Sequence, residues 1–109
     1  MELMSLYWKE KYGAKVISTD EGYILYNAYE DNSVYIRELF VKREARNKGV
    51  GKELEDKLIE KENPNFIFCD IDLESNNPEI ALVQIIKKAG YKIDHVTPSG
   101  KRIVLYKQV

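Results

Sequence analysis

The sequence predicts an α+β domain: a mixed, mostly antiparallel sheet with flanking helices. Three observations lead to this class. Short runs rich in β-branched and aromatic residues alternate with turn residues early in the chain. Two longer segments carry apolar residues at helical spacing. Two more strand-like runs end the chain. The predicted element order is α-β-β-β-α-β-α-β-β, within a single domain spanning residues 1–109.

The first part of the chain is expected to form a short helix and then three strands. Over residues 2–12, Leu3, Leu6 and Tyr7 share one helical face, and Gly13 is placed to end the helix. The strands are expected at 14–18, 23–29 and 34–42. Because the turns between them are short, these strands should form an antiparallel meander.

A long helix is expected over 49–61, followed by a fourth strand over 66–73. The buried stripe of this helix consists of Val50, Leu54, Leu58 and Ile59. Asn63-Pro64 ends the helix, because proline cannot continue it. A helical crossover from the third strand to the fourth implies that the two pair in parallel or splay apart in a near-parallel way.

The second long helix has well-marked ends. Asn77 is expected at its N-cap, Pro78 in its first turn and Gly90 just beyond its last turn. Its apolar face consists of Ala81, Leu82, Ile85, Ile86 and Ala89. Residues 91–96 and 102–106 are then expected to form a terminal hairpin.

Composition and charge exclude several classes of protein. The formal net charge of -1 gives no support to a general nucleic-acid or membrane-surface role. The N-terminal residues carry charges and lack a long apolar core, so neither a signal peptide nor a membrane span is expected, and the protein should be cytoplasmic. Cys69 is the only cysteine and His95 the only histidine, which argues against a disulfide framework and a metal site.

The most informative stretch is the basic turn from Arg46 to Lys52, between the third strand and the first long helix. Its glycines let a ligand approach the backbone, and the first amides of a helix lack intrahelical partners. This arrangement is suited to binding phosphate. A P-loop does not fit, because Glu53 replaces its metal-binding hydroxyl, and a dinucleotide fingerprint does not fit, because Leu54 replaces its third glycine. A loop that only turns the chain is the remaining alternative.

Arg46, Gly49 and Gly51 form the pattern R-x-x-G-x-G. With this motif and its element order, the sequence resembles the GNAT family of N-acetyltransferases, whose signature is [Q/R]-x-x-G-x-[G/A] at a strand-to-helix turn. The likeness extends over about residues 22–106 and includes the Gly90-Tyr91 pair. It implies the GNAT-like acyl-CoA N-acyltransferase fold. It also implies direct acetyl transfer from acetyl-CoA, as cosubstrate and without a metal, to an amine in a ternary complex.

The resemblance also implies roles for individual residues. The backbone amides from Asn47 to Gly51 should hold the CoA pyrophosphate, and the backbone of the third strand should pair with the pantetheine arm like an added strand. The amide of Phe40 or Val41 should stabilise the oxyanion. Asn77 lies where the family often contacts pantetheine, with helix capping as the competing role. The expected cofactor-binding residues are Leu39, Phe40, Val41, Arg46, Asn47, Lys48, Gly49, Val50, Gly51, Lys52 and Asn77.

Two carboxylates are candidate catalytic bases for the amine. Glu38 lies on the third strand and is expected to share a face with Ile36 and Phe40, an apolar setting of the kind that raises the pKa of a carboxyl group. Asp72 belongs to a row with Asp70 and Glu74, expected on one face of the fourth strand. For both candidates, a solvated surface carboxylate is the competing interpretation.

Two departures from the family pattern affect the expected function. Ile85 and Ile86 occupy the helical region where many members carry a tyrosine that protonates the leaving thiolate. The chain also has only residues 1–13 where members usually have a further strand and helix that line the acceptor site. A non-catalytic regulatory module that binds acetyl-CoA or CoA is therefore the alternative function. The acceptor amine, as a small molecule or a protein group, and a homodimer through the terminal strand both stay open.

Overall fold

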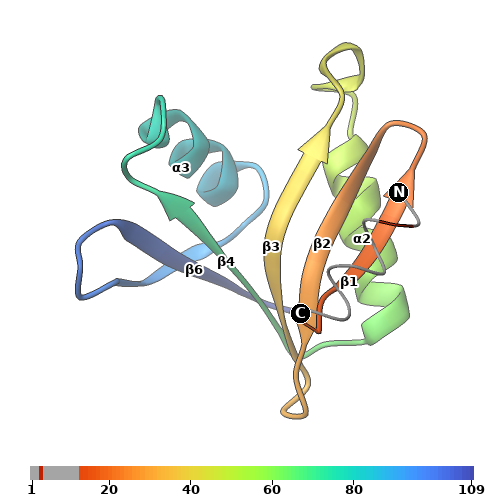
Figure 1. Ribbon diagram of the computed structural model, residues 1–109, viewed down its shortest axis with the longest axis horizontal. Helices are drawn as coiled ribbons and strands as arrows, with labels where there is room; N and C mark the ends of the chain where they lie inside the picture. The colour runs from red at the N-terminus through yellow and green to blue at the C-terminus, as the bar shows by residue number, and fades with distance from the viewer. Residues whose placement is uncertain (1–2, 4–12) are drawn as a thin grey trace.

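The computed structural model describes Leu3 and residues 13–109, which form a six-stranded sheet with helices packed on it (Figure 1). The strands are β1 (Lys15–Thr19), β2 (Gly22–Ala28), β3 (Ser33–Val41), β4 (Phe66–Asp72), β5 (Lys92–Val96) and β6 (Arg102–Gln108). The helices are α2 (Val50–Glu62), α3 (Pro78–Lys87) and the short 3-10 helix η1 (Arg43–Ala45). The helix expected over residues 2–12 lies, apart from Leu3, outside the described residues.

The strand order is β1-β2-β3-β4-β6-β5. The meander β1-β2-β3 is antiparallel, and so is the hairpin β5-β6, as the short turns predict. β4 pairs along its whole length with β6 in antiparallel orientation. The sheet is therefore mixed and mostly antiparallel, which confirms the predicted fold class.

β3 and β4 pair in parallel over only three residues each, Ser33–Tyr35 with Phe66–Phe68, and then separate. Figure 1 shows the two strands leaving a common base near the C-terminus and diverging like the arms of a V, with α2 beside one arm and α3 beside the other. The sequence-based expectation of a near-parallel splay is therefore confirmed. The open edges beyond Tyr35 and Phe68 create the slot in which a ligand can pair with the backbone.

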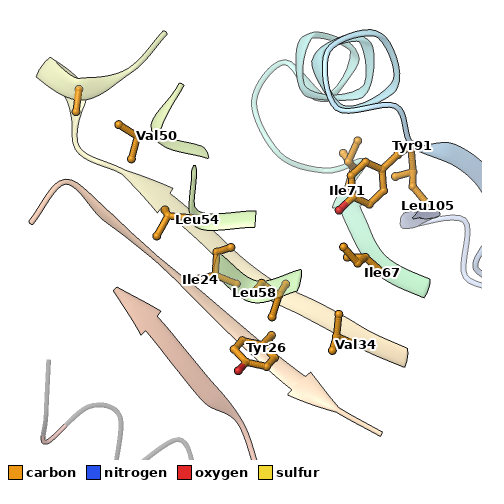
Figure 2. Packing of buried hydrophobic residues seen from close by; sticks show 11 residues of the cluster. Ile24, Tyr26, Val34, Val50, Leu54, Leu58, Ile67, Ile71, Tyr91 and Leu105 are labelled. Carbon is orange, nitrogen blue, oxygen red and sulfur yellow. The ribbon is translucent and has the colours of Figure 1, made fainter. Parts of the chain in front are cut away.

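The core lies between the sheet and the helices, where buried side chains from both arms meet (Figure 2). The stripe predicted for α2 is confirmed: Leu54 and Leu58 are fully buried at 0% exposure and Val50 is 5% exposed. On the other arm, Ile67 and Leu105 are also fully buried. Each such leucine stabilises the fold by about 1.5–3 kcal/mol through burial alone, so the core holds α2 firmly against β2 and β3.

The capping role predicted for Asn77 is wrong in one respect. Asn77 occupies the N-cap position of α3, but its φ is 55° and its side chain makes no capping hydrogen bond. Instead, its backbone carbonyl accepts a hydrogen bond from the Ile80 amide at 3.2 Å. Pro78 starts the helix as expected, because proline suits the first turn. Asn77 is thus exposed, and its side chain does not cap the start of the helix.

No helix among the described residues has the length and apolar character that crossing a membrane requires.

Candidate functional site

The turn between β3 and α2 contains two left-handed residues. Asn47 has φ 62° and Gly49 has φ 83°, and Gly49 is the N-cap residue of α2. An added Cβ on Gly49 would meet no atom within 4 Å, so the requirement for glycine there is conformational rather than steric. These two left-handed residues let the chain pass from the end of β3 into the first turn of α2.

The first turn of α2 presents free backbone donors. The Glu53 amide is the first to bond within the helix, to the Gly49 carbonyl at 3.0 Å, so the amides of Val50, Gly51 and Lys52 lack intrahelical acceptors. The helix dipole adds partial positive charge at the same end. An added Cβ on Gly51 would meet only Leu39 Cδ2, at 3.9 Å, which leaves space for a ligand beside the backbone. The geometry fits an anion such as phosphate.

A pocket of about 670 Å³ opens in front of these amides. It is lined by Val41, Ala45, Arg46, Asn47, Gly49, Val50, Gly51, Gln84 and Lys88. One side therefore comes from the turn and the start of α2, and the other side comes from α3. Two cationic side chains, Arg46 and Lys88, face this space from the two sides.

A second pocket, of about 410 Å³, continues from the first between α2 and α3. The two share Gly49, Gly51, Gln84 and Lys88. The second pocket is called here the inner pocket, and it is lined by Ile36, Leu39, Gly49, Gly51, Lys52, Glu55, Asp56, Cys69, Gln84, Ile85, Lys88, Ala89, Tyr91 and Lys107. Because Ile36 of β3 and Cys69 of β4 both line it, the inner pocket reaches the point where the two strands separate.

Arg46 has a structural contact as well as a place in the pocket. Its Nε donates a hydrogen bond to the Val41 carbonyl at 3.0 Å, and its guanidinium carbon lies 6.0 Å from the centre of the Phe40 ring. These contacts fasten the turn to the end of β3. The guanidinium has further N–H donors, so the hydrogen bond to Val41 leaves others directed elsewhere.

The remaining expected cofactor-binding residues divide into two groups. Leu39, Val41, Asn47, Val50 and Lys52 line one of the two pockets, together with the glycines. Lys52 also forms an exposed ion pair with Asp56 at 3.1 Å. Phe40, Lys48 and Asn77 line neither pocket. Phe40 points to the other face of the sheet, where its ring lies 5.8 Å from that of Tyr23.

The expected setting of Glu38 is wrong. The register between β2 and β3 shifts at Leu25/Tyr26, so Arg37 is an extra residue in β3 and side-chain alternation is interrupted there. Ile36 consequently packs against the core, whereas Glu38 lies on the opposite face with Phe40. Glu38 is exposed, and its Oε1 accepts a hydrogen bond from the Tyr23 hydroxyl at 2.6 Å. The carboxylate raises the pKa of Tyr23 to about 12, mainly through this hydrogen bond.

The acidic row on β4 is used for internal contacts. Asp70 accepts hydrogen bonds from the Tyr35 hydroxyl and from Arg102, both at 2.7 Å. Asp72 Oδ1 accepts a hydrogen bond from the Glu74 amide at 2.9 Å, in the turn that follows β4. Neither aspartate lines either of the two pockets described above. Asp70 and Asp72 are therefore both engaged in contacts within the protein.

The sequence analysis missed residues from α2, from α3 and from the end of the chain. Gln84 and Lys88 line both pockets, and Glu55 and Lys107 line the inner one. The spacing of Gln84 and Lys88, four residues apart on a helix, is a signal for a shared face that could have been used. Lys107 had no such signal, because it reaches the pocket only through the pairing of β6 with β4.

Comparison with known proteins gives a family match. The family model described as "Acetyltransferase (GNAT) family" matches residues 4–90. No curated protein matches the chain.

Solved structures resemble the chain in fold. A putative GNAT acetyltransferase from Desulfovibrio desulfuricans superposes with a TM-score of 0.68 at 12% identity, covering 84% of this chain and 64% of that one. A putative streptothricin acetyltransferase from Bacillus anthracis, in complex with acetyl coenzyme A, superposes with a TM-score of 0.64 at 22% identity. The match covers 82% of this chain and 56% of that one. A Bacillus subtilis acetyltransferase in complex with CoA superposes with a TM-score of 0.63 at 19% identity. The match covers 99% of this chain and 84% of that one. At these identities the likeness establishes the fold, and the chain spans less than two thirds of the first two structures.

Proposed function

Because the chain belongs to the GNAT acetyltransferase family, we propose that it binds acetyl-CoA and transfers the acetyl group to an amine by direct attack. The observation that carries this proposal is the continuity of the two pockets. They run from the free amides at the start of α2 to the point where β3 and β4 separate. A ligand with a phosphate at one end and an extended arm fits that shape, and acetyl-CoA is such a ligand.

In the proposed complex, the CoA pyrophosphate lies against the amides of Val50, Gly51 and Lys52. Arg46 and Lys88 add positive charge from the two sides of the first pocket, called here the outer pocket. Relatives from Bacillus anthracis and Bacillus subtilis were solved with acetyl-CoA and with CoA, which supports this choice of ligand. Lys48 is exposed and contributes through its charge rather than by direct contact.

The pantetheine arm is proposed to follow the open edge of β3. Among residues 13–109, β3 beyond Tyr35 is paired with β2 alone, so its other edge presents backbone groups that can bond an extended chain. Leu39 and Val41 line the pockets on this path. The amide of Phe40 or Val41 is proposed to donate to the oxyanion that forms when the amine attacks the thioester carbon.

Glu38 is the proposed base and Asp72 the second candidate. Glu38 lies on β3 opposite the helices, on the face from which an amine can reach the slot without crossing the CoA pocket. It is exposed, and within the described part of the chain it accepts one hydrogen bond, at Oε1 from Tyr23, which leaves Oε2 to meet water or an amine. Asp72 is the weaker candidate, because it is engaged by the turn after β4.

A calorimetric titration with acetyl-CoA and with CoA tests the binding step. Binding of both ligands supports the proposal, and no binding at millimolar ligand contradicts it. A coupled assay for released CoA thiol, over a panel of small amines and peptide N-termini, then tests transfer. The expected result is amine-dependent release of CoA.

A non-catalytic acetyl-CoA or CoA sensor is the second candidate function. The specific observation in its favour is that Ile85 lines the inner pocket on α3, where a tyrosine is expected for protonation of the thiolate. Binding without CoA release across the amine panel would favour the sensor. Release above the amine-free rate would favour the enzyme.

A further inference from the structure

The inner pocket has an ion pair at the end far from the glycine turn. Glu55 of α2 accepts a hydrogen bond from Lys107 of β6 at 2.6 Å. The two side chains are only 13% and 31% exposed, so water screens the pair weakly. The Lys107 ammonium also lies 5.7 Å from the centre of the Tyr91 ring. A partly buried cation is thus held in the pocket by two contacts, one from α2 and one from Tyr91.

This cation lies at the base of the splay between β3 and β4. Lys107 is the register partner of Ile67, which is adjacent to Phe68, the last residue of β4 to pair with β3. Ile36 and Cys69, the next residues along each strand, line the same pocket as Lys107. The thioester is proposed to lie in this slot. Lys107 is therefore placed beside the reacting sulfur rather than beside the phosphates.

The distance along α2 is compatible with this placement. Gly51 at the pocket mouth and Glu55 at its far end are four residues apart, about one helical turn or ~6 Å along the axis. The pantetheine arm is longer than one helical turn. A CoA molecule with its pyrophosphate at Gly51 can therefore bring its sulfur to the Glu55–Lys107 pair.

The reaction creates a thiolate, which needs stabilisation. When the amine nitrogen bonds to the carbonyl carbon and the C–S bond breaks, the electron pair of that bond goes to sulfur. The titratable and charged groups facing this space are Lys52, Glu55, Asp56, Cys69, Lys88, Tyr91 and Lys107. Lys52 is paired with Asp56 and highly exposed, and Lys88 lies at the end shared with the outer pocket.

The two neutral titratable groups in the pocket, Cys69 and Tyr91, are poorly suited to give up a proton. Burial raises the pKa of the Cys69 thiol to about 12 and raises the pKa of Tyr91 above its ordinary value. Proton transfer from either group to a CoA thiolate, with a pKa near ~8.5, is uphill. A fixed cation needs no proton transfer to stabilise a thiolate.

We propose that Lys107, held by Glu55, stabilises the departing CoA thiolate in place of the absent helix tyrosine. The ammonium has three N–H donors, and the bond to Glu55 leaves two for the sulfur. The electron pair released from the C–S bond stays on sulfur as an ion pair with Lys107. The proton lost by the amine leaves through the base, and the thiolate takes a proton from water after release. This inference rests on the proposed function.

The pKa of the bound CoA thiol tests the inference without requiring turnover. It can be followed by the ¹³C shift of CoA labelled at the carbon next to sulfur. The cation should hold the titration midpoint below the free value of ~8.5. Lys107→Met should raise the midpoint by about one pH unit, Lys107→Arg should keep it low, and Glu55→Gln should lower it further. Lys15→Met is the matched control, because Lys15 also pairs with a glutamate of α2, Glu62, but lines neither pocket.

Kinetics give a second readout. Lys107→Met should lower kcat about tenfold, the equivalent of one pH unit in thiolate stability, while the Kd for acetyl-CoA stays close to that of the wild type. Binding of CoA with the same thiol midpoint in wild type and Lys107→Met would overturn this inference and leave the proposed function intact. Failure of the wild type to bind CoA would overturn both.

Discussion

The Tyr35 hydroxyl donates a hydrogen bond to Asp70 Oδ2 at 2.7 Å, across the point where β3 and β4 separate. Arg102 donates to the other oxygen of the same carboxylate, also at 2.7 Å. Burial, and then the hydrogen bond to Asp70, raise the pKa of Tyr35, so this phenol stays protonated and keeps donating. On the opposite face, the Glu55–Lys107 pair joins α2 to β6. Two polar contacts therefore hold the base of the slot, one on each face of the sheet.

Tyr35→Phe should lower the free energy of unfolding by about 1–3 kcal/mol, because it removes the hydrogen bond to a carboxylate and leaves the ring in place. The Tyr35 ring stacks on Phe68, with 6.4 Å between the two ring centres, and phenylalanine at position 35 keeps this contact. Urea unfolding measures the change. Tyr29→Phe is the control, since that hydroxyl makes an exposed 3.2 Å bond to Arg37 and its loss should cost no more than about 0.5 kcal/mol. Equal effects of the two substitutions would show that the Tyr35–Asp70 bond contributes no special stability.

Two substitutions at Gly51 should affect stability and CoA binding differently. Because Gly51 is helical and open, Gly51→Ala should stabilise the protein by about 0.5–1 kcal/mol. Gly51→Leu places a large side chain at the entrance of both pockets and should weaken CoA binding at least tenfold, about 1.4 kcal/mol. Thermal unfolding and calorimetric titration measure the two effects.

Gly49→Ala provides the contrasting variant at the same turn. Its φ of 83° disfavours any residue with a Cβ, so this substitution should cost about 1–2 kcal/mol of stability. If Gly51→Leu bound CoA as tightly as the wild type, the pyrophosphate would not lie at the start of α2.

Glu38→Gln should change the pH dependence of turnover. A base is active when deprotonated, so the wild-type rate should fall as the pH drops through the pKa of that base. The variant should lose most activity near neutral pH and least at alkaline pH, where free amine is already abundant. The measurement is kcat/KM against pH, with Asp72→Asn beside it. A pH profile that changes in Asp72→Asn but not in Glu38→Gln would assign the role to Asp72.

Glu62 should make stability depend on pH. Its Oε2 accepts hydrogen bonds from the buried Tyr26 hydroxyl at 2.6 Å and from Lys15 at 3.3 Å. The bond from Tyr26, followed by that from Lys15, lowers the pKa of Glu62 below its ordinary value. A depressed carboxyl pKa stabilises the fold above the unfolded pKa of ~4.3, and this contribution is lost as the pH falls through the folded pKa.

Glu62→Gln should therefore cost about 1 kcal/mol at pH 7, and the difference from the wild type should shrink as the pH falls below ~4. Urea unfolding at a series of pH values measures it. Glu60→Gln, an exposed change on the same helix, is the control. A difference that stayed constant from neutral to acid pH would mean that the carboxylate charge is not what stabilises the fold.

Local patterns predicted the elements and the glycine turn, whereas contacts between distant residues were not predictable. The apolar spacing of Val50, Leu54 and Leu58 placed α2, and the helical crossover indicated the splay of β3 and β4. The extra residue at Arg37 was missed, because a register shift depends on how β2 and β3 pair and not on the sequence of β3 alone. Glu55 and Lys107 lie 52 residues apart, so only the folded sheet brings them together.

The Cys69 thiol should be almost unreactive in the folded protein, although it lines the inner pocket. Burial, more than the neighbouring carboxylates Asp70 and Glu55, raises its pKa to about 12. At pH 8 such a thiol is only about one ten-thousandth thiolate, whereas a free cysteine with a pKa of ~8.5 is about a quarter thiolate. Alkylation by iodoacetamide should therefore be more than about a thousandfold slower in the native protein than in urea. The protein unfolded in urea serves as the control, because it carries the same cysteine. Labelling at a similar rate in both states would mean that Cys69 is hydrated from the slot and ionises as readily as a free cysteine. The acetyl-CoA thioester would then be exposed to the same water, and the slot would protect the reaction poorly.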